Sequence, residues 1–278
     1  MRANQLCLAL GLTLLPGPLA FRATGRLPAA VRRSSGCAMS EGAAQQRPLV
    51  VIGLTSNDQY PNGDPTGWYL PEAVDPYNTF TKAGFDVLFA SIKGGVAPCD
   101  PKSVREASET SLAFWEDPEL RALTERTIPL WSVDPAACDA LFFAGGFGVM
   151  WDFPDDPGLQ ALTRDVYEAA KPVGGVCHGP IALINVQLHD GSYLVDGKEV
   201  TAFTNGEEDE VGKYEVVTRT GPGSCQDMLT ARGGRFKDGG IWATNVCVAG
   251  NLMTGQNPAS ATPLAEAMVE AVNKRMGN

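Results

Sequence analysis

Residues 173–185, which read VGGVCHGPIALIN, constrain the fold more than any other part of this sequence. A short strand-like run ends at Cys177, a helix-like run follows at once, and glycines at 174, 175 and 179 leave room for a tight turn. This is the layout of a nucleophile elbow, which puts a side chain at the carboxyl end of a parallel strand and at a helix N-terminus. We therefore expect a thiol with a lowered pKa, although a buried core cysteine beside a chance histidine fits the same letters.

Apolar runs alternate with helix-like stretches over most of the remaining chain. Buried strands are predicted over residues 48–54, 85–91, 140–144, 173–176 and 243–249. Helices are predicted over residues 70–83, 158–170, 224–232 and 259–276, and as two pieces within 103–126. This alternation predicts an α/β fold with a doubly wound, mostly parallel sheet sandwiched by helices. Ligands bind beyond the carboxyl ends of such strands, so the loops near Asn57, Gly146 and Cys177 are the expected site.

Three stretches between the elbow and the last helix are assigned from local signals. Asp196-Gly197 suits a primed turn, so residues 193–201 are predicted to form a β-hairpin. Residues 203–211 contain the acidic run EEDE and are predicted to be a solvated loop. Residues 252–260, LMTGQNPAS, are predicted to be a loop that leads into the closing helix.

The N-terminal 40 residues differ in composition from the rest of the chain. They contain five arginines and no acidic residue, and the apolar run 6–15 is too short to span a bilayer comfortably. An apolar core followed by a basic, Ala- and Ser-rich stretch resembles the bipartite plastid presequence of algae with complex plastids; a secretory signal or a mitochondrial presequence is the alternative. We expect residues 1–46 to be a targeting presequence, removed or disordered, and residues 47–278 to form the α/β domain.

Composition argues against several classes of function. The formal charge of −10 disfavours a nucleic-acid surface. Seven scattered cysteines form no CxxC pair, and two histidines leave little from which to build a zinc site. The glycine-rich turns have neither the spacing nor the lysine of a phosphate-binding loop, and no later segment is apolar enough to cross a membrane. We therefore predict neither a cofactor nor a metal ion, and a mature form that binds neither nucleic acid nor membrane.

Two further features have a functional and a structural interpretation. Gly145-Gly146 is a turn whose backbone N–H groups could hold an oxyanion, but a tight turn that needs a positive φ has the same sequence. Glu72 lies at the start of a predicted helix, where a carboxylate commonly serves the helix N-terminus. The residues alone leave both alternatives open.

Five motifs follow one another along the chain: WYLPEAVDPYNTFTKAGFDVLFAS, FFAGGFGVMWDFP, VGGVCHGP, VTAFTNGEE and MTGQNPASA. In this order they resemble the ThiJ/PfpI superfamily, in particular its glyoxalase III and heat-shock chaperone branch, which has the class I glutamine amidotransferase-like, flavodoxin-like fold. Together they extend the resemblance over residues 48–272, which is nearly all of the expected mature chain.

The resemblance implies a set of site residues. It assigns Cys177 as nucleophile, His178 as its histidine, Glu72 as a carboxyl close to the thiol, and Glu208 as the acid that orients the histidine, with Glu207 one position away. It places Gly146, with the His178 backbone N–H, in an oxyanion hole, and implies that substrate binds at Gly145, Gly146, Phe147 and Gly179. Many relatives have a histidine where this chain has Phe147, which puts the detail of the turn in doubt.

The resemblance also implies an activity. It predicts a glutathione-independent glyoxalase of the D-lactate dehydratase type, a hydro-lyase that converts methylglyoxal and related 2-oxoaldehydes to 2-hydroxy acids through the cysteine and needs no cofactor. The alternatives are a stress-response holding chaperone, a thiol redox sensor, or a protein or nucleotide deglycase. Relatives of this kind are commonly homodimers, so a homodimer is expected.

Overall fold

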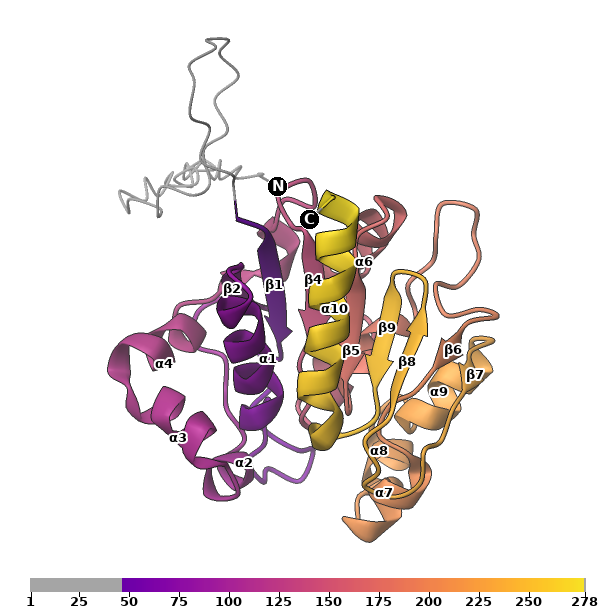
Figure 1. Cartoon of the computed structure of the whole chain (residues 1–278). Helices are drawn as coiled ribbons and strands as arrows, with labels where there is room; N and C mark the ends of the chain where they lie inside the picture. The colour runs from indigo at the N-terminus through magenta and orange to yellow at the C-terminus, as the bar shows by residue number, and fades with distance from the viewer. Residues whose placement is uncertain (1–46, 278) are drawn as a thin grey trace, which may run out of the picture. The chain divides into compact units, whose positions relative to one another are not determined.

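A seven-stranded sheet forms the centre of the computed structural model, which describes residues 47–277 (Figure 1). Its strands, in chain order, are β1 (Leu49–Leu54), β2 (Asp86–Ser91), β3 (Ile128–Pro129), β4 (Ala140–Phe143), β5 (Val173–Val176), β8 (Val246–Ala249) and β9 (Leu252–Gly255). The spatial order is β3-β2-β1-β4-β5-β9-β8, and every neighbouring pair is parallel except β8 with β9. The doubly wound, mostly parallel sheet is confirmed. The expected presequence, residues 1–46, lies outside the described residues.

Helices cover both faces of the sheet. The α-helices are α1 (Leu70–Lys82), α2 (Pro101–Arg105), α3 (Glu109–Glu116), α4 (Pro118–Glu125), α5 (Val149–Asp152), α6 (Pro157–Glu168), α7 (Asn205–Glu210), α8 (Tyr214–Thr220), α9 (Cys225–Ala231) and α10 (Ala261–Met276). Short 3₁₀ segments are η2 (Leu130–Ser132), η3 (Gly179–Leu183) and η4 (Pro258–Ser260). Helices α1 and α10 lie together on the face towards the viewer in Figure 1. None of the helices within 47–277 is long and apolar enough to cross a membrane.

The sheet separates two hydrophobic cores, which explains why its strands have apolar residues at successive positions. Val50 and Ile52 of β1 pack into the core under α1 and α10, whereas Val51 packs into the core on the other face, with residues of α6 and η3. All three side chains are fully buried. Successive residues of a strand point to opposite faces, so a strand covered on both sides reads as a continuous apolar run.

Several sequence predictions in the first half of the chain are confirmed. Helix α1 begins at Leu70, and Gly84, just beyond its end, has the positive φ of 84° expected of a glycine at that position. The two pieces expected within 103–126 are α3 and α4. They separate at Asp117, whose side chain accepts hydrogen bonds from the first turn of α4. The short helix α2 precedes them.

Three predictions in the second half of the chain are wrong. No hairpin forms over residues 193–201: β6 (Glu199–Val200) pairs in parallel with the distant β7 (Arg235–Phe236), so long-range pairing prevails over the local turn signal. The acidic stretch is not a loop, because it contains α7. Residues 252–255 are the buried strand β9, between β5 and β8, instead of a loop. The predicted buried strand before it is the edge strand β8.

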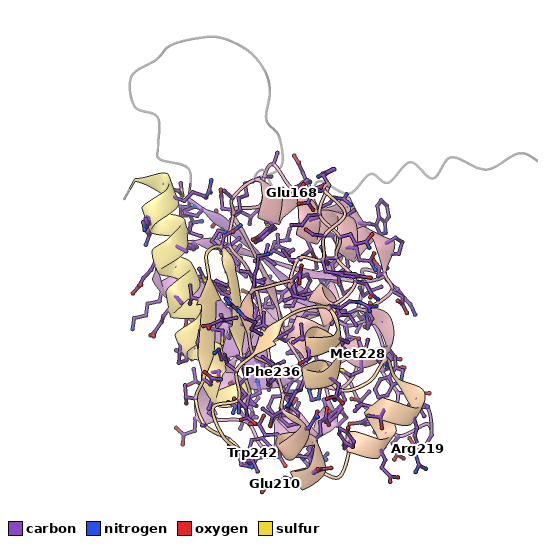
Figure 2. All side chains as sticks on the ribbon, turned by 90° about the vertical axis from the view of Figure 1, so that its right-hand side faces the viewer. Glu168, Glu210, Arg219, Met228, Phe236 and Trp242 are labelled. Carbon is purple, nitrogen blue, oxygen red and sulfur yellow. The ribbon has the colours of Figure 1, made fainter. Side chains whose placement is uncertain are left out.

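The segment that carries α7, α8 and α9 lies beside the β8 edge, near the carboxyl ends of the parallel strands (Figure 1). Figure 2 shows this side of the molecule, with Arg219 of α8, Met228 of α9 and Phe236 of β7 labelled. Helix α7 begins with a capping box: Thr204 accepts from the Glu207 N–H, and the Glu207 carboxylate accepts in return from the Thr204 N–H. This cap sets the start of the helix that carries Glu208.

Candidate active site

The elbow at the end of β5 holds Cys177 in a strained backbone conformation. Its φ is 60°, in the left-handed region that residues other than glycine rarely adopt. The Cys177 N–H donates to the Gly255 carbonyl at 3.0 Å, and its own carbonyl accepts from the Phe203 N–H at 2.9 Å. A Cβ on Gly179 would lie 2.3 Å from the Phe143 carbonyl oxygen, so the turn needs glycine there. Strain of this kind persists only where the surroundings fix it, and the nucleophile-elbow geometry is present.

The segment after the elbow is shorter than the sequence indicated. It is the 3₁₀ segment η3, of five residues, and not an α-helix. A single 3₁₀ turn aligns few peptide dipoles, so it stabilises a thiolate less than a helix N-terminus would. The Cys177 side chain is also buried, with 4% of its residue surface exposed.

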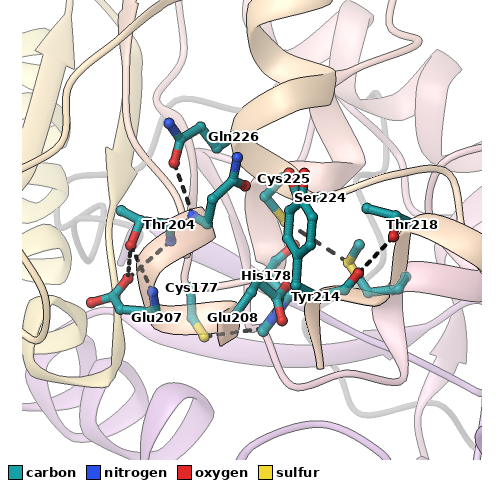
Figure 3. Close-up of polar contacts among 12 residues, drawn as sticks. Cys177, His178, Thr204, Glu207, Glu208, Tyr214, Thr218, Ser224, Cys225 and Gln226 are labelled. Atoms are coloured by element: carbon teal, nitrogen blue, oxygen red, sulfur yellow. Dashed lines mark hydrogen bonds and ion pairs between the residues drawn. The ribbon is translucent and has the colours of Figure 1, made fainter. Parts of the chain in front are cut away.

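The imidazole of His178 joins Cys177 to Glu208 (Figure 3). Its Nδ1 lies 3.3 Å from the Cys177 Sγ, and its Nε2 lies 2.8 Å from the Glu208 Oε1. Both the imidazole and the Glu208 carboxyl are buried. A carboxylate can only accept, so Nε2 carries the hydrogen and the lone pair of Nδ1 faces the thiol. Of the two acids that the sequence left open, the structure places Glu208, not Glu207, against the histidine.

Two phenylalanine rings pack against the imidazole. The Phe147 ring centroid is 4.3 Å from that of His178, and the Phe203 centroid is 4.6 Å from it. Phe147, which stands where many members of the resembled family have a histidine, therefore contacts the His178 imidazole directly. Phe203 did not enter the sequence-based set of site residues, although it lies in the VTAFTNGEE motif. Two apolar rings exclude water from the imidazole and restrict its rotation.

Glu72 lies beneath the thiol at the start of α1 and is fully buried. Its Oε2 accepts the Gly145 N–H at 3.0 Å, and its Oε1 has no hydrogen-bond partner among residues 47–277. Burial raises the pKa of this carboxyl to about 8, and the neighbouring Cys177 side chain and the Gly145 N–H oppose the rise. Glu72 is therefore a neutral acid near pH 7, able to donate a hydrogen bond towards the sulfur.

The expectation of a lowered pKa for Cys177 is wrong for the site as it stands. Burial raises the pKa of the thiol well above its usual range, and the Glu72 carboxyl adds to this rise once it is ionised. The helix N-terminus on which the expectation depended is only a 3₁₀ turn. The thiol therefore keeps its proton near neutral pH, and the His178 Nδ1 lies 3.3 Å from the sulfur, within reach of that proton.

The Gly145-Gly146 turn packs against the elbow that carries the thiol. Gly146 has a φ of 96°, and a Cβ there would lie 2.4 Å from the Gly67 carbonyl oxygen. A Cβ on Gly145 would lie 2.8 Å from the His178 backbone nitrogen, so the turn and the elbow are in close contact. In the described part of the chain, neither the Gly146 nor the His178 N–H has an acceptor. Two free donors side by side fit an oxyanion hole.

The four residues predicted to bind substrate differ in the contacts that their backbone N–H groups and side chains make. Gly146 keeps a free N–H, whereas the Gly145 N–H is occupied by Glu72. Gly179 packs against β4, and Phe147 packs on His178. Like the Gly146 N–H, the Phe147 and Gly179 N–H groups have no acceptor within residues 47–277, and the packing of these two residues supports the imidazole and the elbow. Among residues 47–277, no group of three or more His, Cys, Asp or Glu side chains is placed to hold a metal ion.

Comparisons with known proteins agree with this geometry. The sequence profile of the DJ-1/PfpI family matches residues 68–271, a range that includes every site residue described above. The glutathione-independent glyoxalase hsp3102 of Schizosaccharomyces pombe is 33% identical over 238 residues, which cover 81% of this chain and 96% of the relative. The crystal structure of glyoxalase III from Candida albicans, 27% identical, superposes with a TM-score of 0.75 over 81% of this chain and 97% of that one. The Rapid Encystment Protein 24 KDa of Francisella tularensis, 34% identical, superposes with a TM-score of 0.76 over 81% of this chain and 99% of that one.

Proposed function

The chain belongs to the DJ-1/PfpI family, and we propose that it is a glutathione-independent glyoxalase that converts methylglyoxal and related 2-oxoaldehydes to 2-hydroxy acids. One observation carries the proposal: the buried line from Cys177 through His178 to Glu208, with the neutral acid Glu72 on its other side. This set provides a nucleophile, a base and an acid within one small site. Two of the relatives named above, hsp3102 and the Candida albicans glyoxalase III, have names that support the same reaction.

The first step is addition of the Cys177 sulfur to the aldehyde carbon. A carbon–sulfur bond forms, the carbonyl electron pair moves to oxygen, and the thiol proton passes to the His178 Nδ1, 3.3 Å from the sulfur. Glu208 accepts from Nε2 and stabilises the imidazolium that results. The new oxyanion takes hydrogen bonds from the free N–H groups of Gly146 and His178, then a proton from the imidazolium, which gives a hemithioacetal.

The second step moves a hydrogen from C1 to C2. The neutral His178 removes the C1 hydrogen, while the Glu72 carboxylic acid protonates the ketone oxygen on C2, which gives an enediol. Return of the proton from His178 to C2, with loss of the C1 hydroxyl proton to Glu72, yields a thioester of the 2-hydroxy acid. Carbon C1 is oxidised and C2 is reduced within one molecule, so the step needs no external electron acceptor.

Water completes the cycle. It adds to the thioester carbonyl, the carbon–sulfur bond breaks, and the sulfur regains a proton. The net change is the addition of one water molecule to methylglyoxal to give lactate. Cys177 and Glu72 return to their starting protonation states, so each turnover leaves the site unchanged.

The decisive experiment measures lactate formed by the purified protein from methylglyoxal in the absence of glutathione, with D- and L-lactate distinguished by stereospecific lactate dehydrogenases. We expect D-lactate from the wild type and none from Cys177→Ser. Absence of lactate from the wild type would contradict the proposal. Suppression of protein aggregation that persists in Cys177→Ser would favour a stress-response chaperone instead.

A further inference from the structure

Glu207, the residue before the acid that orients His178, is a buried carboxylate shared by three segments. Its Oε2 serves the helix cap through Thr204, at 2.9 Å from the backbone N–H and 3.1 Å from the hydroxyl. Its Oε1 accepts from the Trp242 N–H at 2.9 Å, from the Gln256 side chain at 3.0 Å and from the Asn257 side chain at 2.8 Å. A capping box needs only the first of these two oxygens. The second oxygen ties α7 to the loop at 239–243.

The same loop is fastened at further points. The Gln256 side chain donates to the Gly240 carbonyl at 2.8 Å and accepts the Gly239 N–H at 2.9 Å. The Asn257 side chain donates to the Ala243 carbonyl at 2.8 Å. These amides bridge Glu207 and the loop, so the position of the loop depends on the carboxylate.

Trp242 is the part of this loop that contacts Phe203. Its φ of 58° is in the left-handed region, where glycine is the ordinary residue, yet this chain has its largest side chain there. The indole N–H donates to the Glu210 Oε2 at 2.9 Å, and Figure 2 shows the two labelled residues next to each other. The indole meets the Phe203 ring edge-to-face, with centroids 5.7 Å apart. Phe203 in turn packs on the imidazole of His178.

We propose that Glu207 and Trp242 are positioning residues for His178. Glu207 holds the Trp242 backbone in its strained conformation, Trp242 supports Phe203, and Phe203 keeps the imidazole in the plane where Nδ1 meets the thiol. The same carboxylate sets the start of α7, so Glu207 also places Glu208 against Nε2. Glu207 thereby acts on the imidazole in two ways: on its ring face through Trp242 and Phe203, and on its Nε2 through Glu208. The effect on turnover rests on the proposed glyoxalase function, whereas the effect on the imidazole does not.

The test compares Trp242→Gly with Trp242→Phe in the full-length protein. Glycine accepts the φ of 58° and keeps the N–H that Glu207 binds, so it removes the ring without disturbing the loop backbone. Phenylalanine keeps an aromatic ring against Phe203. Trp131→Ala is the control, because Trp131 is a more exposed indole, 68% accessible, at the other edge of the sheet. Glu207→Gln is the second variant. Both carboxylate oxygens of Glu207 accept hydrogen bonds, so the amide N–H group of glutamine would face one set of these donors.

Two readouts decide the outcome. The first is kcat and KM for methylglyoxal. We expect Trp242→Gly to lower kcat by roughly 10- to 100-fold with little change in KM, because a small displacement of a catalytic group costs rate and Trp242 is not placed to touch a small substrate. The second is the NMR spectrum of the two imidazoles at one fixed pH. The chemical shifts of the His178 ring signals should change in Trp242→Gly and Glu207→Gln, while those of His189, on the surface, stay as in the wild type. Trp242→Phe should retain most of the activity.

Two results would overturn the proposal. One is a Trp242→Gly variant that has the kcat and the His178 chemical shifts of the wild type. The other is a lower kcat that accompanies a lower melting temperature while the His178 signals remain unchanged, since that pattern belongs to a purely structural residue. If the wild type makes no lactate, the proposed function fails, but the NMR comparison still decides whether Glu207 and Trp242 position the imidazole.

Discussion

Replacement of Glu72 by glutamine should make the fold more stable, and increasingly so as the pH rises from 5 to 8. Burial raises the pKa of this carboxyl from 4.5 to about 8. Between these two values the unfolded chain has released the proton and the folded protein still holds it. The folded state therefore binds the extra proton, and stability falls as pH rises through this window. Glutamine carries no titrating proton, so the variant does not suffer this loss.

The size of the effect follows from the shift in pKa. Each unit is worth about 1.4 kcal/mol, so a rise from 4.5 to about 8 limits the loss to on the order of 4–5 kcal/mol, reached near pH 8. Near pH 7 the loss of folding stability is about 3 kcal/mol. Glutamine can still accept the Gly145 N–H and donate towards the sulfur, so its contacts are close to those of the neutral acid.

Urea unfolding of the wild type and Glu72→Gln at pH 5 and pH 8 measures the difference directly. The exposed Glu109, also in the first turn of a helix, provides the control variant Glu109→Gln, which should show no such dependence. A stability difference between wild type and Glu72→Gln that is the same at both pH values would refute the assignment of a neutral buried acid. In the glyoxalase assay, Glu72→Gln and Glu72→Ala should both lower kcat, because neither side chain can transfer the proton that the enediol step needs. Wild-type rates in Glu72→Gln, Glu72→Ala and Glu72→Asp alike would remove Glu72 from the mechanism.

Further predictions concern the nucleophile, the base, the oxyanion turn and the N-terminus. Cys177→Ser should abolish lactate formation and His178→Ala should lower kcat by about 10²–10⁴, both with circular dichroism spectra like the wild type; a serine variant with wild-type turnover would exclude covalent catalysis at this position. Gly146→Ala should destabilise the protein and reduce kcat, because its Cβ would meet the Gly67 carbonyl. Gly95→Ala is the control, since Gly95 has a φ of 78° and open space around it. This control should cost only the backbone strain of about 1–2 kcal/mol and leave kcat unchanged. We also propose that residues 1–46 are a plastid-targeting presequence. A chain without these residues should keep its melting temperature and activity. A fluorescent protein fused to them should leave the cytosol, so cytosolic fluorescence would contradict the proposal.

The elements that sequence predicted well are those whose signal is local. The strand–turn pattern before Cys177 and the helical spacing after Leu70 depend on neighbouring residues, and both appear where expected. The capping box at Thr204 was equally local, and its TNGE signature would have revealed α7 had the acidic run not been read as a solvated loop. The hairpin prediction was wrong for a different reason: β6 pairs with β7 (Arg235–Phe236), which is far along the chain.

The sequence by itself predicted the parallel sheet, apart from β3 and β9, and the elbow that carries Cys177 and His178, since alternating apolar runs and a glycine-bordered turn leave few other arrangements. The tertiary structure alone decided which of two adjacent acids meets the histidine, because that depends on the direction in which α7 leaves its cap. It also decided the protonation of the site: Glu72 is neutral and the Cys177 thiol is hard to ionise because folding removes both from water. Burial is the sum of contacts from distant segments, and no stretch of sequence records it.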